Sequence, residues 1–163
     1  MEEYHVKLIV NGENVCAKVD AEQSLLTFLR KNGFMEVKCG CEKGDCGTCT
    51  VIMNGKTIKS CITLALQANG KEIVTVKDLE KTEISRKLQE SFVEHGAVQC
   101  GFCTAGMLMV AKVYLDKNSI PDKMEIRKAI SGNLCRCTGY KKIVEAIYAV
   151  AVENYGVEGD INV

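Results

Sequence analysis

Four cysteines and three glycines lie within residues 38–49, KCGCEKGDCGTC. Thiolates are the ligands that iron–sulfur clusters and other soft metal centres prefer. The spacing Cys41-x4-Cys46-x2-Cys49, followed by Cys61, is the plant-type pattern of four thiolates around a [2Fe-2S] cluster. Zinc is the main rival, but zinc sites usually pair their cysteines as C-x2-C, so this spacing favours iron and sulfide.

The remaining residues of this segment also suit a cluster. Gly40, Gly44 and Gly47 tolerate positive φ, which lets the backbone turn sharply and aim N–H groups at an anionic centre. The distance along the chain from Cys39 to the later cysteines matches no ligand pattern, so we expect Cys39 to lie beside the cluster. Cys16 stands in an alternating segment and is expected to be a small, buried or half-buried strand residue.

A second cysteine set lies in two short segments, QCGFC at 99–103 and LCRCTG at 134–139. Two predicted helices separate the segments, and each segment stands at a helix terminus, where thiolates and anionic clusters are stabilised. The spacing suits zinc as well as iron, and the presence of the first set favours a second cluster. The four candidate ligands of this set are Cys100, Cys103, Cys135 and Cys137.

The elements that carry the first set form an α+β unit, which we assign to residues 1–78. Alternating apolar residues predict strands, apolar residues at helical spacing predict helices, and Asn-Gly is the strongest short signal for a hairpin turn. The predicted elements are strands at 4–10 and 15–19, a helix at 24–33, a hairpin around Asn54-Gly55 and a strand at 72–76.

The rest of the chain, residues 79–163, changes to helical periodicity. Apolar residues recur at helical spacing in four segments, which begin near residues 84, 104, 122 and 141. These segments predict a four-helix bundle. No linker rich in Gly, Ser or Pro marks the boundary, so we expect the two units to pack closely.

Composition narrows the classes of partner. The 163 residues include 21 basic and 21 acidic side chains, which gives no electrostatic field to attract nucleic acid or a membrane surface. The start of the sequence lacks the pattern of a signal peptide, and no apolar run approaches the roughly 20 residues that span a bilayer. The expected location is therefore cytoplasmic, and in that reducing compartment ten cysteines indicate metal ligands more than disulfides.

Three segments, GCEKGDCGTCTV, QCGFCTAGM and SGNLCRCTGY, together resemble the iron–sulfur subunit of the molybdenum hydroxylase family, which includes xanthine oxidase and aldehyde oxidoreductase. The resemblance implies a β-grasp, plant-type ferredoxin domain followed by a four-helix bundle, each holding one [2Fe-2S] cluster. It also implies a hetero-oligomer with a molybdopterin-binding large subunit and an FAD-binding medium subunit. In that family, electrons pass one at a time from the molybdopterin centre through both clusters to FAD.

The resemblance implies roles for single residues as well. Residues that match Gln99 and Cys137 contact the pterin on the partner subunit in similar proteins, although Gln99 could instead bond local backbone. Ala105 stands where the family usually has proline, and we expect no loss of the cluster, because alanine also suits a helix start. Arg136 is expected to point outward. We assign no catalytic residue to this chain.

The sequence thus predicts an electron-transfer subunit, without a substrate site of its own, in an oxidoreductase of the xanthine dehydrogenase type. A free-standing ferredoxin-like carrier and a zinc-stabilised binding module are the alternatives. The frequency of substrates in the family favours a purine or xanthine, while aldehydes, nicotinate-like heterocycles and aromatic thioesters stay open. We expect the helical cluster to receive electrons first and to be more buried than the Cys41 cluster.

Overall fold

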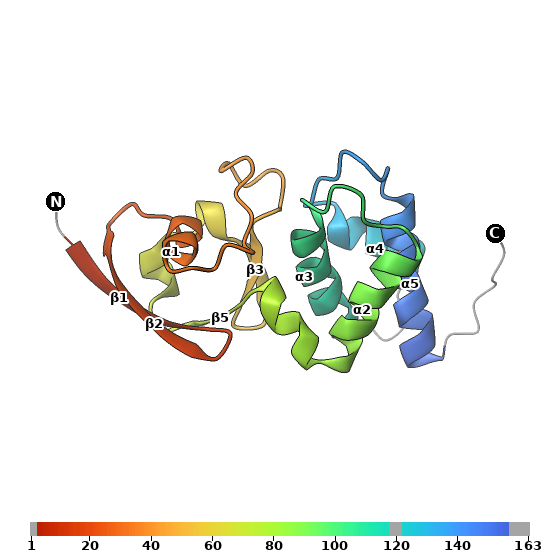
Figure 1. Ribbon diagram of the computed structural model, residues 1–163, viewed down its shortest axis with the longest axis horizontal. Coiled ribbons are helices and arrows are strands. Elements are labelled where there is room, and N and C mark those ends of the chain that lie inside the picture. Colours follow the sequence, from red (N-terminus) through yellow and green to blue (C-terminus); the bar gives the residue numbers. More distant parts are fainter. Residues whose placement is uncertain (1–2, 118–121, 157–163) are drawn as a thin grey trace.

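The computed structural model describes residues 3–117 and 122–156, which form a sheet-containing unit and a helical unit side by side (Figure 1). The strands are β1 (Glu3–Val10), β2 (Glu13–Asp20), β3 (Thr50–Met53), β4 (Lys56–Lys59) and β5 (Glu72–Val74). The α-helices are α1 (Leu25–Lys31), α2 (Glu83–Glu94), α3 (Thr104–Leu115), α4 (Lys123–Ile130) and α5 (Lys141–Tyr155). Short 3-10 helices are η1 (Ser60–Ile62), η2 (Ala65–Ala68) and η3 (Val76–Lys81).

The sheet is mixed, with the strand order β2-β1-β5-β3-β4. Strand β1 runs parallel to β5, and the other neighbouring pairs are antiparallel. Helix α1 packs against this sheet, and its buried Leu25, Phe28 and Leu29 join Val6 and Ile73 in one apolar core. The predicted α+β class is confirmed.

Local sequence explains where these elements begin and turn. The Ser24 side chain accepts a hydrogen bond of 3.2 Å from the Thr27 N–H and so caps the start of α1. Asn54 and Gly55 both have positive φ, 47° and 75°, which the tight turn between β3 and β4 requires. The hairpin predicted from Asn54-Gly55 is therefore confirmed.

The helical unit contains α2 to α5, the four helices that the sequence predicts. Helix α2 packs on α5, and α3 packs on α4. Their inward faces supply one apolar core, which includes the fully buried Phe92, Met107, Ile126 and Ile147. The Asp122 side chain accepts a hydrogen bond of 2.6 Å from the Glu125 N–H and caps α4.

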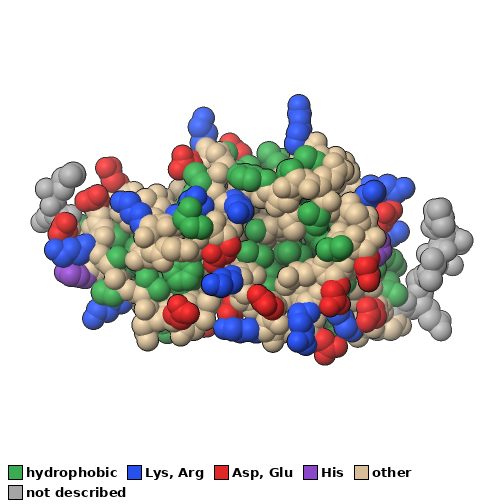
Figure 2. Space-filling model, viewed as in Figure 1, with side chains coloured by type: hydrophobic (Ala, Val, Ile, Leu, Met, Phe, Trp, Pro, Cys, Tyr) green, Lys and Arg blue, Asp and Glu red, His purple; other side chains and the backbone are tan. Residues whose placement is uncertain are grey.

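The two units pack against each other. Ile52 on β3 is 6% exposed and belongs to the apolar core of the helical unit, where β3 lies against α3. Helix η3 connects β5 to the helical unit, so the boundary at residue 78 stays a prediction. Figure 2 shows basic and acidic side chains interspersed on the visible face. Within the described residues, no helix has both the length and the apolar character needed to cross a bilayer.

One expectation about the sheet is wrong. Cys16 is exposed, whereas its neighbours Ala17 and Val19 contribute to the core of the sheet unit. The register explains the difference, because Cys16 lies opposite Lys7 on the solvent-facing side of the β1–β2 pair, and β2 is an edge strand. Alternation alone identifies two faces and leaves open which of them is buried.

Candidate metal centres

The first candidate site is built by one loop and one short helix. Cys41, Cys46 and Cys49 lie in the loop between α1 and β3, and Cys61 lies in η1 after β4. The Cys41 Sγ accepts hydrogen bonds of 3.4 Å from the backbone N–H groups of Lys43 and Cys46. The Cys61 thiol interacts with Cys49 and lies within electrostatic range of Cys41. The structure therefore brings these four cysteines together.

The turns of this loop require glycine. Gly44 and Gly47 have φ of +84° and +71°, a region that other L-residues rarely adopt. At Gly40 the obstacle is contact, because a Cβ atom there would stand 2.9 Å from the Cys46 Sγ. A residue with a side chain therefore does not fit at these three positions, where the backbone turns around the thiols. The sequence predicts such glycine turns for a loop that holds a cluster.

Electrostatics divide the thiols of the first site. The backbone N–H groups of Cys46 and Lys43 lower the pKa of Cys41 to about 6, because they stabilise a thiolate. Burial and the neighbouring Cys49 thiol raise the pKa of Cys61 to about 11. The Cys41 thiol therefore ionises readily, whereas a bound metal would be needed to favour the Cys61 thiolate.

The second candidate site joins two loops at the same end of the helical unit (Figure 1). Cys100 and Cys103 lie between α2 and α3, and Cys135 and Cys137 lie between α4 and α5. The Sγ atoms of Cys100 and Cys137 are 3.6 Å apart. The thiols of Cys103 and Cys135 also interact with each other. The four cysteines thus meet as an outer pair, Cys100 with Cys137, and an inner pair, Cys103 with Cys135.

Neighbouring groups fix the inner pair. The Cys135 N–H donates a 2.9 Å hydrogen bond to the Tyr140 hydroxyl, and the Thr138 hydroxyl lies 3.0 Å from the Cys135 Sγ. Burial opposes ionisation of Cys135, but hydrogen bonds from Thr138, the Cys137 backbone and the Cys103 thiol together outweigh it and lower the pKa. Burial, followed by the contact with Cys135, raises the pKa of Cys103 to about 12. Neither Thr138 nor Tyr140 was predicted from the sequence as a site residue, although they stand one and three residues after the last candidate ligand, Cys137.

The paired arrangement fits a two-iron cluster. A [2Fe-2S] cluster with four cysteine ligands takes two thiolates on each iron, so its thiolates approach in pairs. In the residues that the structure describes, no three metal-ligating side chains of the His, Cys, Asp and Glu types form a group that could hold one metal ion. The donor set, its pairing and the glycine turns therefore fit the cluster that the sequence predicts.

Exposure differs between the two sites and corrects one expectation. Cys49 is buried and the other three candidate ligands of the first site are half-buried, whereas Cys100 and Cys137 are exposed. The helical site is therefore the more exposed one in this chain, which contradicts the prediction that it is more buried. The reason is its position on loops beyond the helix ends, where Phe102 and Leu134 are also 46% and 53% exposed.

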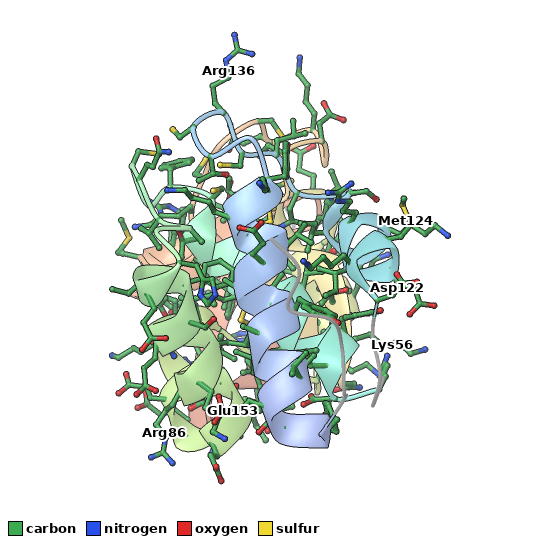
Figure 3. All side chains as sticks on the ribbon, turned by 90° about the vertical axis from the view of Figure 1, so that its right-hand side faces the viewer. Lys56, Arg86, Asp122, Met124, Arg136 and Glu153 are labelled. Atoms are coloured by element: carbon green, nitrogen blue, oxygen red, sulfur yellow. The ribbon has the colours of Figure 1, made fainter. Side chains whose placement is uncertain are left out.

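The other predicted residues lie around these sites. Gln99 is exposed and precedes Cys100, and Arg136 is exposed and points away from the protein (Figure 3). The predicted contacts of Gln99 and Cys137 with a pterin stay predictions. Cys39 is exposed. Ala105 lies in the first turn of α3, which begins at Thr104 without a proline.

Direct contacts join the two candidate sites. The Leu134 N–H, next to Cys135, donates a 2.9 Å hydrogen bond to the carbonyl oxygen of Cys46. The Lys59 ammonium, two residues before Cys61, donates to the carbonyl oxygen of Gly132. One hydrogen bond thus joins the backbone of Cys46, a candidate ligand of the first site, to the residue that precedes Cys135 in the second.

Comparison with known proteins gives two family matches and several close relatives. Residues 8–73 match the model of a 2Fe-2S iron-sulfur cluster binding domain, and residues 75–148 match that of a [2Fe-2S] binding domain. The nicotine 6-hydroxylase small subunit of Paenarthrobacter nicotinovorans is 50% identical over 85% of this chain and 84% of that protein. The nicotinate dehydrogenase small FeS subunit of Eubacterium barkeri is 46% identical over 92% of this chain and 97% of that protein. A chain of quinoline 2-oxidoreductase from Pseudomonas putida 86 superposes with a TM-score of 0.87, at 43% identity, over 96% of this chain and 99% of that one.

Proposed function

Because this chain belongs to the iron–sulfur subunits of the molybdenum hydroxylases, we propose that it carries electrons between two other subunits of such an oxidoreductase. The proposed partners are a molybdopterin-binding large subunit and an FAD-binding medium subunit, in a cytoplasmic hetero-oligomer. The two [2Fe-2S] clusters supply one-electron redox chemistry. The protein supplies their ligands, their spacing and their access to partners.

We assign one cluster to each cysteine set. Cys49 and Cys61 interact with each other, and the Cys41 sulfur accepts a hydrogen bond from the Cys46 N–H, so two pairs converge in the first site. The outer and inner pairs do the same in the second site. The proposed ligands are Cys41, Cys46, Cys49 and Cys61 for the first cluster, and Cys100, Cys103, Cys135 and Cys137 for the second.

The observation that carries the proposal is the hydrogen bond from Leu134 to Cys46. Leu134 directly precedes Cys135, a candidate ligand of the second site, and Cys46 is a candidate ligand of the first site. The outer pair, Cys100 and Cys137, is exposed, while Cys46 of the first site lies at this contact. This arrangement supports entry of electrons at the outer pair and their exit from the first site toward FAD.

The alternative of a free-standing carrier receives less support. A free-standing carrier would need only the sheet unit, whereas the helical unit here holds its own cysteine set, and the named relatives are small subunits.

For the substrate of the complex we propose a nitrogen heterocycle, a class that includes the purines. The names of the relatives support this class, since nicotine, nicotinate and quinoline are all nitrogen heterocycles.

The test is rapid-freeze EPR of the purified complex reduced by its substrate, chosen from a panel of heterocycles and aldehydes. We expect the second cluster to be reduced before the first. Gln99→Ala should slow reduction of the second cluster, because Gln99 is exposed beside Cys100 and is proposed to contact the pterin. Normal reduction of the second cluster with slowed flavin reduction would contradict the proposed order.

A further inference from the structure

A buried amide side chain links the two ligand loops. Asn133 is only 3% exposed, and it precedes Cys135 by two residues. Its Nδ2 donates a 3.0 Å hydrogen bond to the carbonyl oxygen of Gly47, which lies between Cys46 and Cys49 in the other unit. A buried polar side chain needs such a partner, so this contact is a fixed part of the folded protein.

The Gly47 carbonyl oxygen does not depend on Asn133 for its hydrogen bonding. It also accepts hydrogen bonds from the Thr50 N–H, at 3.1 Å, and from the Thr50 hydroxyl, at 2.6 Å. Both of these bonds lie within the sheet unit and close the turn that leads into β3. The distinct contribution of Asn133 is therefore to tie this turn to the helical unit.

Two glycines allow the loops to approach so closely. A Cβ atom on Gly106, in the first turn of α3, would stand 2.3 Å from the Gly47 carbonyl oxygen. A Cβ atom on Gly47 would stand 2.5 Å from the Asn133 Cγ. Neither distance is possible for a real side chain, so the Gly47 carbonyl group lies in a slot between α3 and the loop that follows α4.

Adjacent residues on each side form adjacent bonds. Asn133 binds the carbonyl oxygen of Gly47, and Leu134 binds that of Cys46. Two neighbouring hydrogen bonds fix the orientation of the loops as well as their separation. Because Cys46 and Cys135 are candidate ligands, this contact also sets how the two clusters lie relative to each other.

We propose that Asn133 is a positioning residue for the transfer of one electron from the reduced second cluster to the oxidised first cluster. It acts by holding the two ligand loops as one rigid body, without touching either cluster. This inference rests on the proposed function, because it concerns a step within that electron transfer. It goes beyond that function in assigning the step to a residue that is not a ligand.

The test compares Asn133→Asp with Thr50→Val in the purified complex, fully reduced with dithionite. Asn133→Asp keeps the size of the side chain but replaces the N–H donor with a carboxylate oxygen that repels the Gly47 carbonyl. Thr50→Val removes a different hydrogen bond to the same oxygen, from within the sheet unit. We expect Asn133→Asp to retain both cluster signals in EPR and to lose part of the magnetic splitting between them, while Thr50→Val retains both the signals and the splitting.

Hydrogen exchange gives a second measurement on the same proteins. Loss of one buried hydrogen bond should speed exchange of the peptide that contains Leu134 by roughly fivefold in Asn133→Asp and leave it unchanged in Thr50→Val. If the buried carboxylate of Asn133→Asp prevents folding, Asn133→Ala is measured in its place, because it removes the N–H donor without adding a charge.

Two results would overturn the inference. One is unchanged splitting and unchanged exchange in folded Asn133 variants. The other is the loss of a cluster signal in Asn133→Ala, which would assign Asn133 to formation of a ligand loop. Chemical reduction makes these readouts independent of substrate. If the unmodified complex shows the splitting but substrate reduces neither cluster, the proposed function fails while the role of Asn133 in positioning stands.

Discussion

The two candidate sites use the same ligand type but are built in different ways. In the first, three of the four cysteines lie within residues 41–49, and backbone N–H groups and glycines shape the loop. In the second, each pair of thiols joins two loops that only the packing of four helices brings together. The first site is consequently the more enclosed, and the second keeps its outer pair exposed. Local sequence shapes most of the first site, whereas tertiary packing assembles the second.

Serine substitution of single ligands is expected to have the largest effect and tests whether the two sites are separate. Cys46→Ser should abolish one [2Fe-2S] signal and leave the other, and Cys135→Ser should do the reverse, because serine is a poor substitute for a thiolate ligand. EPR of the reduced protein and its iron content measure this. Cys16→Ser should keep both signals. If Cys39→Ser removed a signal that Cys41→Ser kept, the ligand assignment would be wrong.

A pair of glycine substitutions, one in the first site and one outside it, separates the cost of a steric clash from the cost of backbone strain. Gly47 and Gly70 share a φ of +71°, but a Cβ atom on Gly47 would meet Asn133 and Gly132, whereas one on Gly70 would meet nothing within 4 Å. Gly70→Ala should lower the free energy of unfolding by about 1–2 kcal/mol. Gly47→Ala should cost about 3 kcal/mol or more, because a steric clash adds to the strain. Denaturant unfolding measures both values, and equal losses would contradict the close contact.

Accessibility to a chelator tests the difference in exposure. In the reduced chain without its partners, we expect an iron chelator to remove the second cluster faster than the first, because Cys100 and Cys137 are exposed and Cys49 is buried. Loss of each EPR signal over time measures this. In the complete complex the difference should shrink if the proposed partner covers the outer pair, because the partner would exclude the chelator. Faster loss of the first cluster from the isolated chain would reverse the comparison.

The smallest effect is expected at the edge of the contact between the sites. Lys59→Met removes the ammonium donor to the Gly132 carbonyl oxygen and should lower stability by about 0.5–1 kcal/mol, because the bond is exposed to solvent. Lys56→Met is the matched control on the same strand, since Lys56 is exposed and points into solvent (Figure 3). Thermal unfolding compares the two. A larger loss in the Lys56 variant would contradict the assigned contact.

Much of the fold follows from local signals in the sequence. Asn54-Gly55 gives the β3–β4 turn because both residues must adopt positive φ, and Ser24 marks the start of α1 because its oxygen caps the helix. The spacing from Cys41 to Cys49 describes a single loop, which physical reasoning can treat on its own. Each of these features depends on residues that are close together in the chain.

The features that sequence reasoning missed depend on distant partners. The exposure of Cys16 depends on which face of the sheet α1 covers, and the exposure of Cys100 depends on which end of the bundle is open. Asn133 gives no signal in the sequence beyond being a polar residue before a cysteine. Its role becomes visible only when Gly47, 86 positions earlier, lies against it.

The position of Asn133 late in the chain also bears on how the protein is made. All four cysteines of the first site lie before residue 62, whereas the loop that closes over Gly47 begins near residue 132. During synthesis from the N-terminus, the first site is thus complete before the residues that cover its loop exist. Until the helical unit is made and docks, the Gly47 side of this loop is not covered by Asn133 and Gly106. Afterwards the same contact that aligns the two sites also covers the Gly47 side of the first one.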